Sequence, residues 1–87
     1  MLKLKEKITN TLSLPKEIAL NLPVVTATGR REVIIENYKN LIEFADTLIR
    51  VRTTDSTVTV EGERLTLQHL TTENVMIVGR IARILFE

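Results

Sequence analysis

The sequence contains no cysteine, which excludes disulfide bridges, thiolate metal sites and thiol nucleophiles. Its 12 lysines and arginines nearly balance 11 acidic residues, so no strong overall field draws the protein to nucleic acid or anionic lipid. No apolar run approaches the roughly 18 residues that a membrane span requires. The lysines near the N-terminus precede no continuous apolar block, so we expect no signal peptide.

The apolar residues that the sequence does contain are mainly aliphatic. Hydrophobic residues make up 44% of the 87 positions, whereas aromatic residues make up only 3%. A chain of this length has room for one domain with a modest core, which leaves little spare stability. A protein this small gains from a disulfide, a metal or a partner chain, and the composition favours the last of these.

The first 22 residues differ from the rest. Leu4, Ile8 and Leu12 recur at the spacing of an amphipathic helix, although the first turn could instead be extended. Pro15 suits the first turn of a second short helix, and Pro23 would end it. We therefore predict one or two short helices within residues 1–22, packed on or beside a sheet, followed by an antiparallel β domain over residues 23–87.

From residue 23 onward the apolar residues alternate with polar ones. Short β-branched and aliphatic runs are separated by turn signals every eight to ten residues or so. The runs lie at 25–27, 33–35, 41–44, 49–51, 58–60, 65–67 and 75–86. The turn signals lie at 28–29, 37–40, 45–46, 54–56, 61–63 and 71–74. Because no connection is long enough for a parallel crossover, this pattern predicts a mainly β fold: an antiparallel meander of about six to seven short strands, as an open sheet or roll.

Two runs, 33–35 and 75–78, are apolar on both faces, which requires cover on both sides from the N-terminal helices or from another subunit. Near the end, Ile77 and Ile81 share one parity whereas Ile84 and Phe86 share the other. This switch predicts a bulge around residues 82–83 within a final strand. A terminal helix is the rival interpretation, because Ile81, Ile84 and Leu85 also fit helical spacing.

Catalytic machinery is not evident. The single histidine, His69, has no cysteine or carboxylate cluster at metal-ligand spacing and no serine placed as a nucleophile. The acids Asp46, Asp55, Glu61 and Glu63 fall in predicted turns, where they favour solubility and turn formation. We therefore expect a protein that is not an enzyme, with no cofactor, no metal and no small-molecule substrate.

Arginines offer a second hypothesis. Arg30, Arg31, Arg50 and Arg52 could together form a nucleic-acid-binding surface. Interspersed acids and the absence of an aromatic stacking platform weaken this alternative. Arginines on the solvent-exposed face of a strand also have a structural explanation, since charged side chains prevent unwanted pairing with strands of another chain. The lysines of the N-terminal segment give at most peripheral membrane contact.

The order of several blocks resembles the YabP/YqfC family of sporulation proteins, closest to the YqfC branch. The opening is similar in its proline, threonine and glycine pattern, at Leu14, Pro15, Leu22, Pro23, Thr26 and Gly29. The later blocks IENYKNLIEF (35–44), VTVEGERL (58–65) and VMIVGRI (75–81), followed by Ile84 and Phe86, are similar to family blocks in the same order. Asn40 departs from a frequent glycine, residues 54–56 replace a glycine turn, and Phe86 replaces a usual tyrosine.

The resemblance implies a non-enzymatic protein of spore-forming Firmicutes that acts in the cytoplasm of the mother cell during spore envelope development. It also implies a membrane-linked sporulation protein as a natural partner. Together with the doubly apolar strands, this favours a small scaffold or adaptor that forms a homo-oligomer or binds such a partner. The residues that we expect in these contacts are Leu4, Ile8, Leu12, Met76, Val78, Ile84 and Phe86. The alternative is that they only cover the sheet within one subunit.

Overall fold

The computed structural model describes residues 21–87, and every regular element among them is a β-strand. The mainly β, antiparallel fold expected from the alternation is confirmed. The expected helices, with Leu4, Ile8 and Leu12, lie outside the described residues. The strands are β1 (Val24–Thr28), β2 (Glu32–Glu36), β3 (Tyr38–Ala45), β4 (Leu48–Thr53), β5 (Thr57–Leu70) and β6 (Asn74–Phe86).

The strands form one sheet in the order β1-β2-β6-β5-β4-β3, so the chain is not a simple meander. β2 pairs with β6 rather than with β3. Only Asn37 separates β2 from β3, which is too short for a hairpin between them. Asn37 has a left-handed backbone (φ 64°), and its amide and that of Tyr38 both donate to the carbonyl of Glu73. The chain therefore turns away from β2 at this residue.

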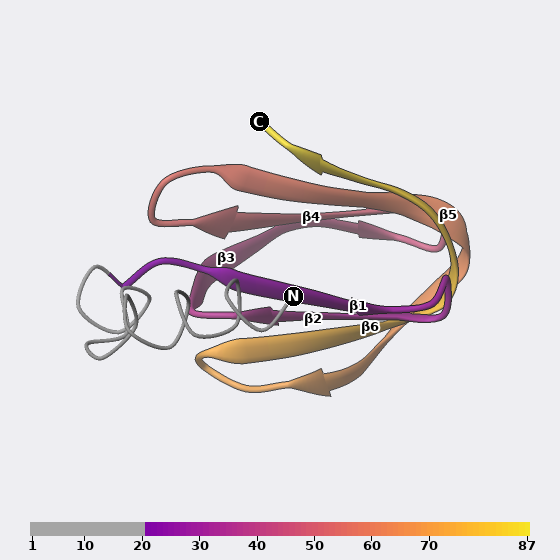
Figure 1. Ribbon diagram of the computed structural model, residues 1–87, viewed down its shortest axis with the longest axis horizontal. Coiled ribbons are helices and arrows are strands. Elements are labelled where there is room, and N and C mark those ends of the chain that lie inside the picture. The colour runs from indigo at the N-terminus through magenta and orange to yellow at the C-terminus, as the bar shows by residue number, and fades with distance from the viewer. Residues whose placement is uncertain (1–20) are drawn as a thin grey trace, which may run out of the picture.

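β5 and β6 are long strands that curve together round one end of the molecule, which we call the bend (Figure 1). The sheet thereby forms two halves. The first half-sheet contains β1, β2, the start of β6 and the end of β5; the second contains β3, β4, the start of β5 and the end of β6. The turn predicted at 61–63 is wrong, because these residues lie inside β5 at the bend.

Register shifts mark the bend. Glu61 pairs with Arg83 and Gly62 with Ile81, which leaves Ala82 as an extra residue of β6. The bulge predicted around residues 82–83 is thus confirmed, and the last segment is a strand rather than a helix. β5 carries an extra residue on the other side of the bend, between Glu63 and Thr66. These insertions reset the alternation so that apolar side chains on both sides of the bend face inward.

Each hairpin turn at this end is fastened to a long strand. In the β1–β2 turn, the carbonyl of Arg31 accepts from the amide of Gly79 (3.0 Å), and that of Arg30 accepts from Ile81 (2.8 Å). In the β3–β4 turn, the carbonyls of Asp46 and Thr47 accept from amides of β5 at 2.8 and 3.1 Å. Backbone groups that the bulges remove from the ladder are therefore satisfied by the two turns.

The core lies between the half-sheets and is one aliphatic cluster. Its buried members alternate along the strands, as the period-two pattern predicted. They are Val33, Ile35, Ile49, Val51, Val58, Val60, Leu65, Val75, Ile77 and Ile81. Thr59 departs from this pattern. Its side chain points away from the cluster but is buried, with only 3% exposed, because Arg50, Leu85 and Glu87 surround it.

Candidate interaction surfaces

The described residues contain no group of three or more histidine, aspartate or glutamate side chains able to hold a metal ion. His69 is exposed on β5 opposite Met76, where a register shift has turned it outward. Within residues 21–87, no helix is long and apolar enough to cross a membrane.

The outward side of the first half-sheet carries an apolar patch, which we call the outer apolar face: Val24, Ile34, Met76 and Val78. Ile34 pairs directly with Met76 across β2 and β6, and Val78 is the next residue of β6 on that side. Val24 lies diagonally across from Ile34 on β1. All four are half-buried, and no other described strand lies over them. The doubly apolar runs predicted from the sequence supply Ile34, Met76 and Val78 of this face.

Ile84 and Phe86, which were expected to act with Met76 and Val78, lie on the other side of the sheet. Ile84 pairs with buried Val60 and packs against the core. Phe86 pairs with buried Val58, so it points inward as well, but it is 63% exposed. The expected contact residues are therefore divided between two surfaces.

The four arginines of the nucleic-acid hypothesis are not brought together. Arg30 and Arg31 lie in the β1–β2 turn at the bend. Arg52 is at the opposite end of β4, where it pairs with Thr57 beside the β4–β5 turn.

Arg50 lies on the outer side of the second half-sheet and forms ion pairs with two acidic residues. Its guanidinium lies 3.4 Å from Glu87 and 4.0 Å from Glu43. Glu87 also accepts a hydrogen bond of 3.1 Å from the hydroxyl of buried Thr59. This arrangement assigns Arg50 to a structural ion pair, so a continuous basic surface across the two half-sheets does not form.

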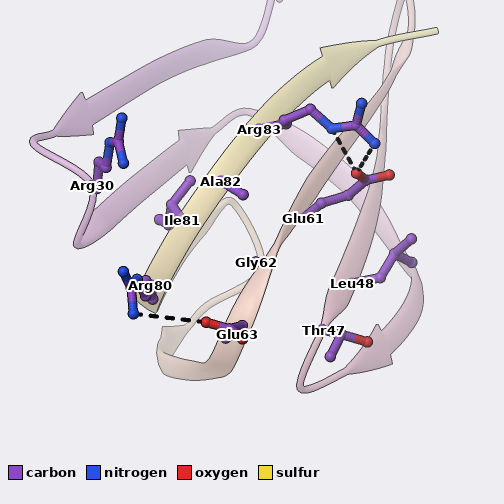
Figure 2. Close-up of a pocket in the computed structure, with 10 residues that line it drawn as sticks. All are labelled: Arg30, Thr47, Leu48, Glu61, Gly62, Glu63, Arg80, Ile81, Ala82 and Arg83. Carbon is purple, nitrogen blue, oxygen red and sulfur yellow. Dashed lines mark hydrogen bonds and ion pairs between the residues drawn. The ribbon is translucent and has the colours of Figure 1, made fainter.

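A different set of arginines meets at the bend. A hollow of about 470 Å³ is bordered by Arg30, Arg80 and Arg83, with Gly62 and Ile81 among the residues that line it (Figure 2). Glu61 forms an ion pair with Arg83, and Glu63 lies 3.9 Å from Arg80. Two further hollows adjoin this one, and Arg80 lines all three. We call Arg30, Arg31, Arg64 and Arg80 the bend surface.

Sequence reasoning did not find the bend surface. Arg64 and Arg80 come from segments far apart in the sequence, and the hollows exist only because β5 and β6 curve together. Val24 was also missed, although it begins an alternating run beside Val25. Ile34 was contained in a doubly apolar run, whose outward residue could have been added to the expected contacts.

Comparison with known proteins identifies a family for the β domain. Residues 21–87, the whole described β domain, match the YabP family. The chain is 24% identical to the uncharacterized protein YqfC of Bacillus subtilis (strain 168) over 79 residues, which cover 91% of this chain and 85% of that protein. No solved structure matches the chain significantly. The family match spans more than half of the sequence, so this chain belongs to the YabP family.

Proposed function

We propose that this protein is a non-enzymatic sporulation protein that acts as a small scaffold or adaptor in spore envelope development, through self-association or a membrane-linked partner. Family membership supports the sporulation role. The observation that carries the contact role is the outer apolar face, where Ile34, Met76 and Val78 are adjacent on the outward side of a sheet whose core lies on the other side.

The free energy of burial supports contact at this face. Covering a side chain such as isoleucine or methionine fully contributes about 1.5–3 kcal/mol. Ile34, Met76 and Val78 are each half-buried, so a partner that covered the remainder would gain part of that amount from each. A contiguous apolar patch on a small domain marks a surface for association.

Among the described strands, β1 forms the edge of the sheet beside this face, and this edge also favours association. β1 contains no charged residue, and its register with β2 is regular throughout. The opposite edge strand, β3, carries Lys39 and Glu43 and has two register shifts with β4. Charges and bulges protect edges against pairing, so β1 is the less protected of the two.

Light scattering on the purified protein across micromolar concentrations tests self-association. We expect a mass above the 9.9 kDa of one chain. Met76→Glu should lower the mass to that of the monomer, because it places a charge in the outer apolar face. Asn40→Glu, which makes the same charge change at an exposed position of β3, should not. A wild-type protein that remains monomeric contradicts self-association and leaves the adaptor role, which requires a different partner.

A further inference from the structure

We infer that the bend surface is a docking site for an acidic segment of a partner protein, a binding site distinct from the outer apolar face. Its four arginines come from the β1–β2 turn, β5 and β6, and the adjoining hollows that they line give room for acidic side chains. The hollows measure about 470, 690 and 490 Å³.

The charges of the bend surface are only partly balanced. Among the described residues, Arg80 has an ion-pair partner in Glu63, whereas Arg30, Arg31 and Arg64 have none within 4.0 Å. Guanidinium groups bind carboxylates through paired, charge-assisted hydrogen bonds. Asp46 and Glu63 line the same hollow as Arg64 without pairing with it. Three arginines without ion-pair partners in the described part of the chain, at one end of a protein of net charge +1, therefore form a local site for carboxylates.

The backbone that carries these arginines is held in place. The carbonyls of Arg30 and Arg31 accept hydrogen bonds from Ile81 and Gly79, which fastens the turn to β6. Leu65, which follows Arg64, donates to the carbonyl of Asp46 at 2.8 Å. A ligand therefore has to order only the arginine side chains and not a loop, which lowers the entropic cost of binding.

Arg64 adds an independent observation. It has a left-handed backbone (φ 54°), a conformation that strains residues other than glycine. Such strain gathers at binding sites, where the surrounding structure maintains it. Arg64 also lines the hollow beside Gly79 and Arg80. The strained position thus holds a long cationic side chain at the hollow, where glycine would fit the backbone better.

An acidic protein segment fits better than nucleic acid. Glu61 and Glu63 border the first hollow and would repel a continuous polyanion, whereas a protein segment can place neutral or basic residues opposite them. None of the aromatic residues, Tyr38, Phe44 and Phe86, lines any of the three hollows, so bases would find no stacking platform there.

The test uses the full chain and a fluorescein-labelled peptide of alternating glutamate and serine, followed by fluorescence anisotropy at low salt. We expect saturable binding that weakens as salt rises, and none to the same peptide with glutamine in place of glutamate. Replacing three arginines together (Arg30→Gln, Arg31→Gln and Arg64→Gln) should raise Kd about tenfold or more, as expected for the loss of three exposed ion pairs.

The matched control removes the same charge elsewhere, through Lys39→Gln, Arg50→Gln and Arg52→Gln on β3 and β4, and should keep Kd within about twofold. An equal loss in both triple variants, or no binding by the wild type, would overturn the proposal. Tighter binding of a mixed-sequence DNA oligonucleotide than of the peptide would also overturn it. Light scattering on the bend-surface variant should give the wild-type mass, which separates this site from self-association.

Arg64→Gly gives a signature that a purely structural role cannot produce. Relief of the left-handed strain should raise Tm, while loss of the guanidinium should weaken peptide binding severalfold. Arg64→Lys should retain most of the binding and keep the wild-type Tm. Unchanged peptide affinity in Arg64→Gly would remove Arg64 from the proposed site and contradict the role assigned to its strain.

Discussion

Gly62 lies at the bend in close contact with the backbone of β6, and Gly62→Ala should destabilise the fold strongly. An added Cβ would overlap the carbonyl oxygen of Arg80 and lie 3.0 Å from its carbonyl carbon and 3.1 Å from the Cα of Ile81. All three are backbone atoms, which no side-chain rotation can move. β5 and β6 would have to separate at this point.

The magnitude follows from what the separation disturbs. Overpacking costs about 1–3 kcal/mol. Separation also strains the hydrogen bond from the amide of Gly62 to Thr47 and the one from Ile81 to Arg30, each contributing about 0.5–1.5 kcal/mol. The expected loss is thus about 2–6 kcal/mol, against a free energy of unfolding of about 4–13 kcal/mol for a chain of this size.

Urea denaturation followed by circular dichroism measures this loss. Gly29→Ala is the matched control, since nothing lies within 4 Å of its added Cβ and only the left-handed backbone (φ 55°) opposes it. It should lower the free energy of unfolding by about 1 kcal/mol. Gly79→Ala should cost more than Gly29→Ala, because it combines a positive φ (155°) with contacts of 2.7 and 2.9 Å to the backbone of residues 64 and 65. A Gly62→Ala protein as stable as Gly29→Ala would refute the close approach at the bend.

Two further variants test the core and a turn by urea denaturation. Ile77→Ala should lower the free energy of unfolding by about 2–5 kcal/mol, because Ile77 is fully buried; a loss below 1 kcal/mol would contradict its place in the core. Thr53→Val should cost about 1–2 kcal/mol, because the buried hydroxyl of Thr53 donates to the carbonyl of Ser56 (2.9 Å) and accepts from its amide (3.1 Å). An unchanged midpoint would show that these bonds contribute nothing.

The local pattern predicted most strands because alternation reports which face of a strand is buried. Ile49 and Val51 are buried while Arg52 is exposed, and the parity switch after Ile81 placed the bulge at Ala82. The prediction of a turn at residues 61–63 was wrong. It rested on composition, because an acid-glycine-acid run is typical of a loop. Gly62 is instead required by a close contact with a strand distant in the sequence.

Strand order and the bend surface could not be predicted, because both depend on contacts between distant segments. β2 pairs with β6, and the chain leaves β2 at Asn37, a residue that local propensity describes only as a turn former. Arg64 and Arg80 become neighbours of Arg30 through the register of β5 against β6 and the attachment of the β1–β2 turn. The outer apolar face was predictable in part, since its outward residues belong to runs that are apolar on both faces.

The central claim is that the protein works by contact at the outer apolar face, and complementation of sporulation tests it most directly. A spore-forming host that lacks the gene would receive the wild type, Met76→Glu or Asn40→Glu, each confirmed as folded by circular dichroism and present at equal abundance. The account predicts heat-resistant spores with the wild type and Asn40→Glu and few with Met76→Glu. Full restoration by a folded Met76→Glu protein would contradict it.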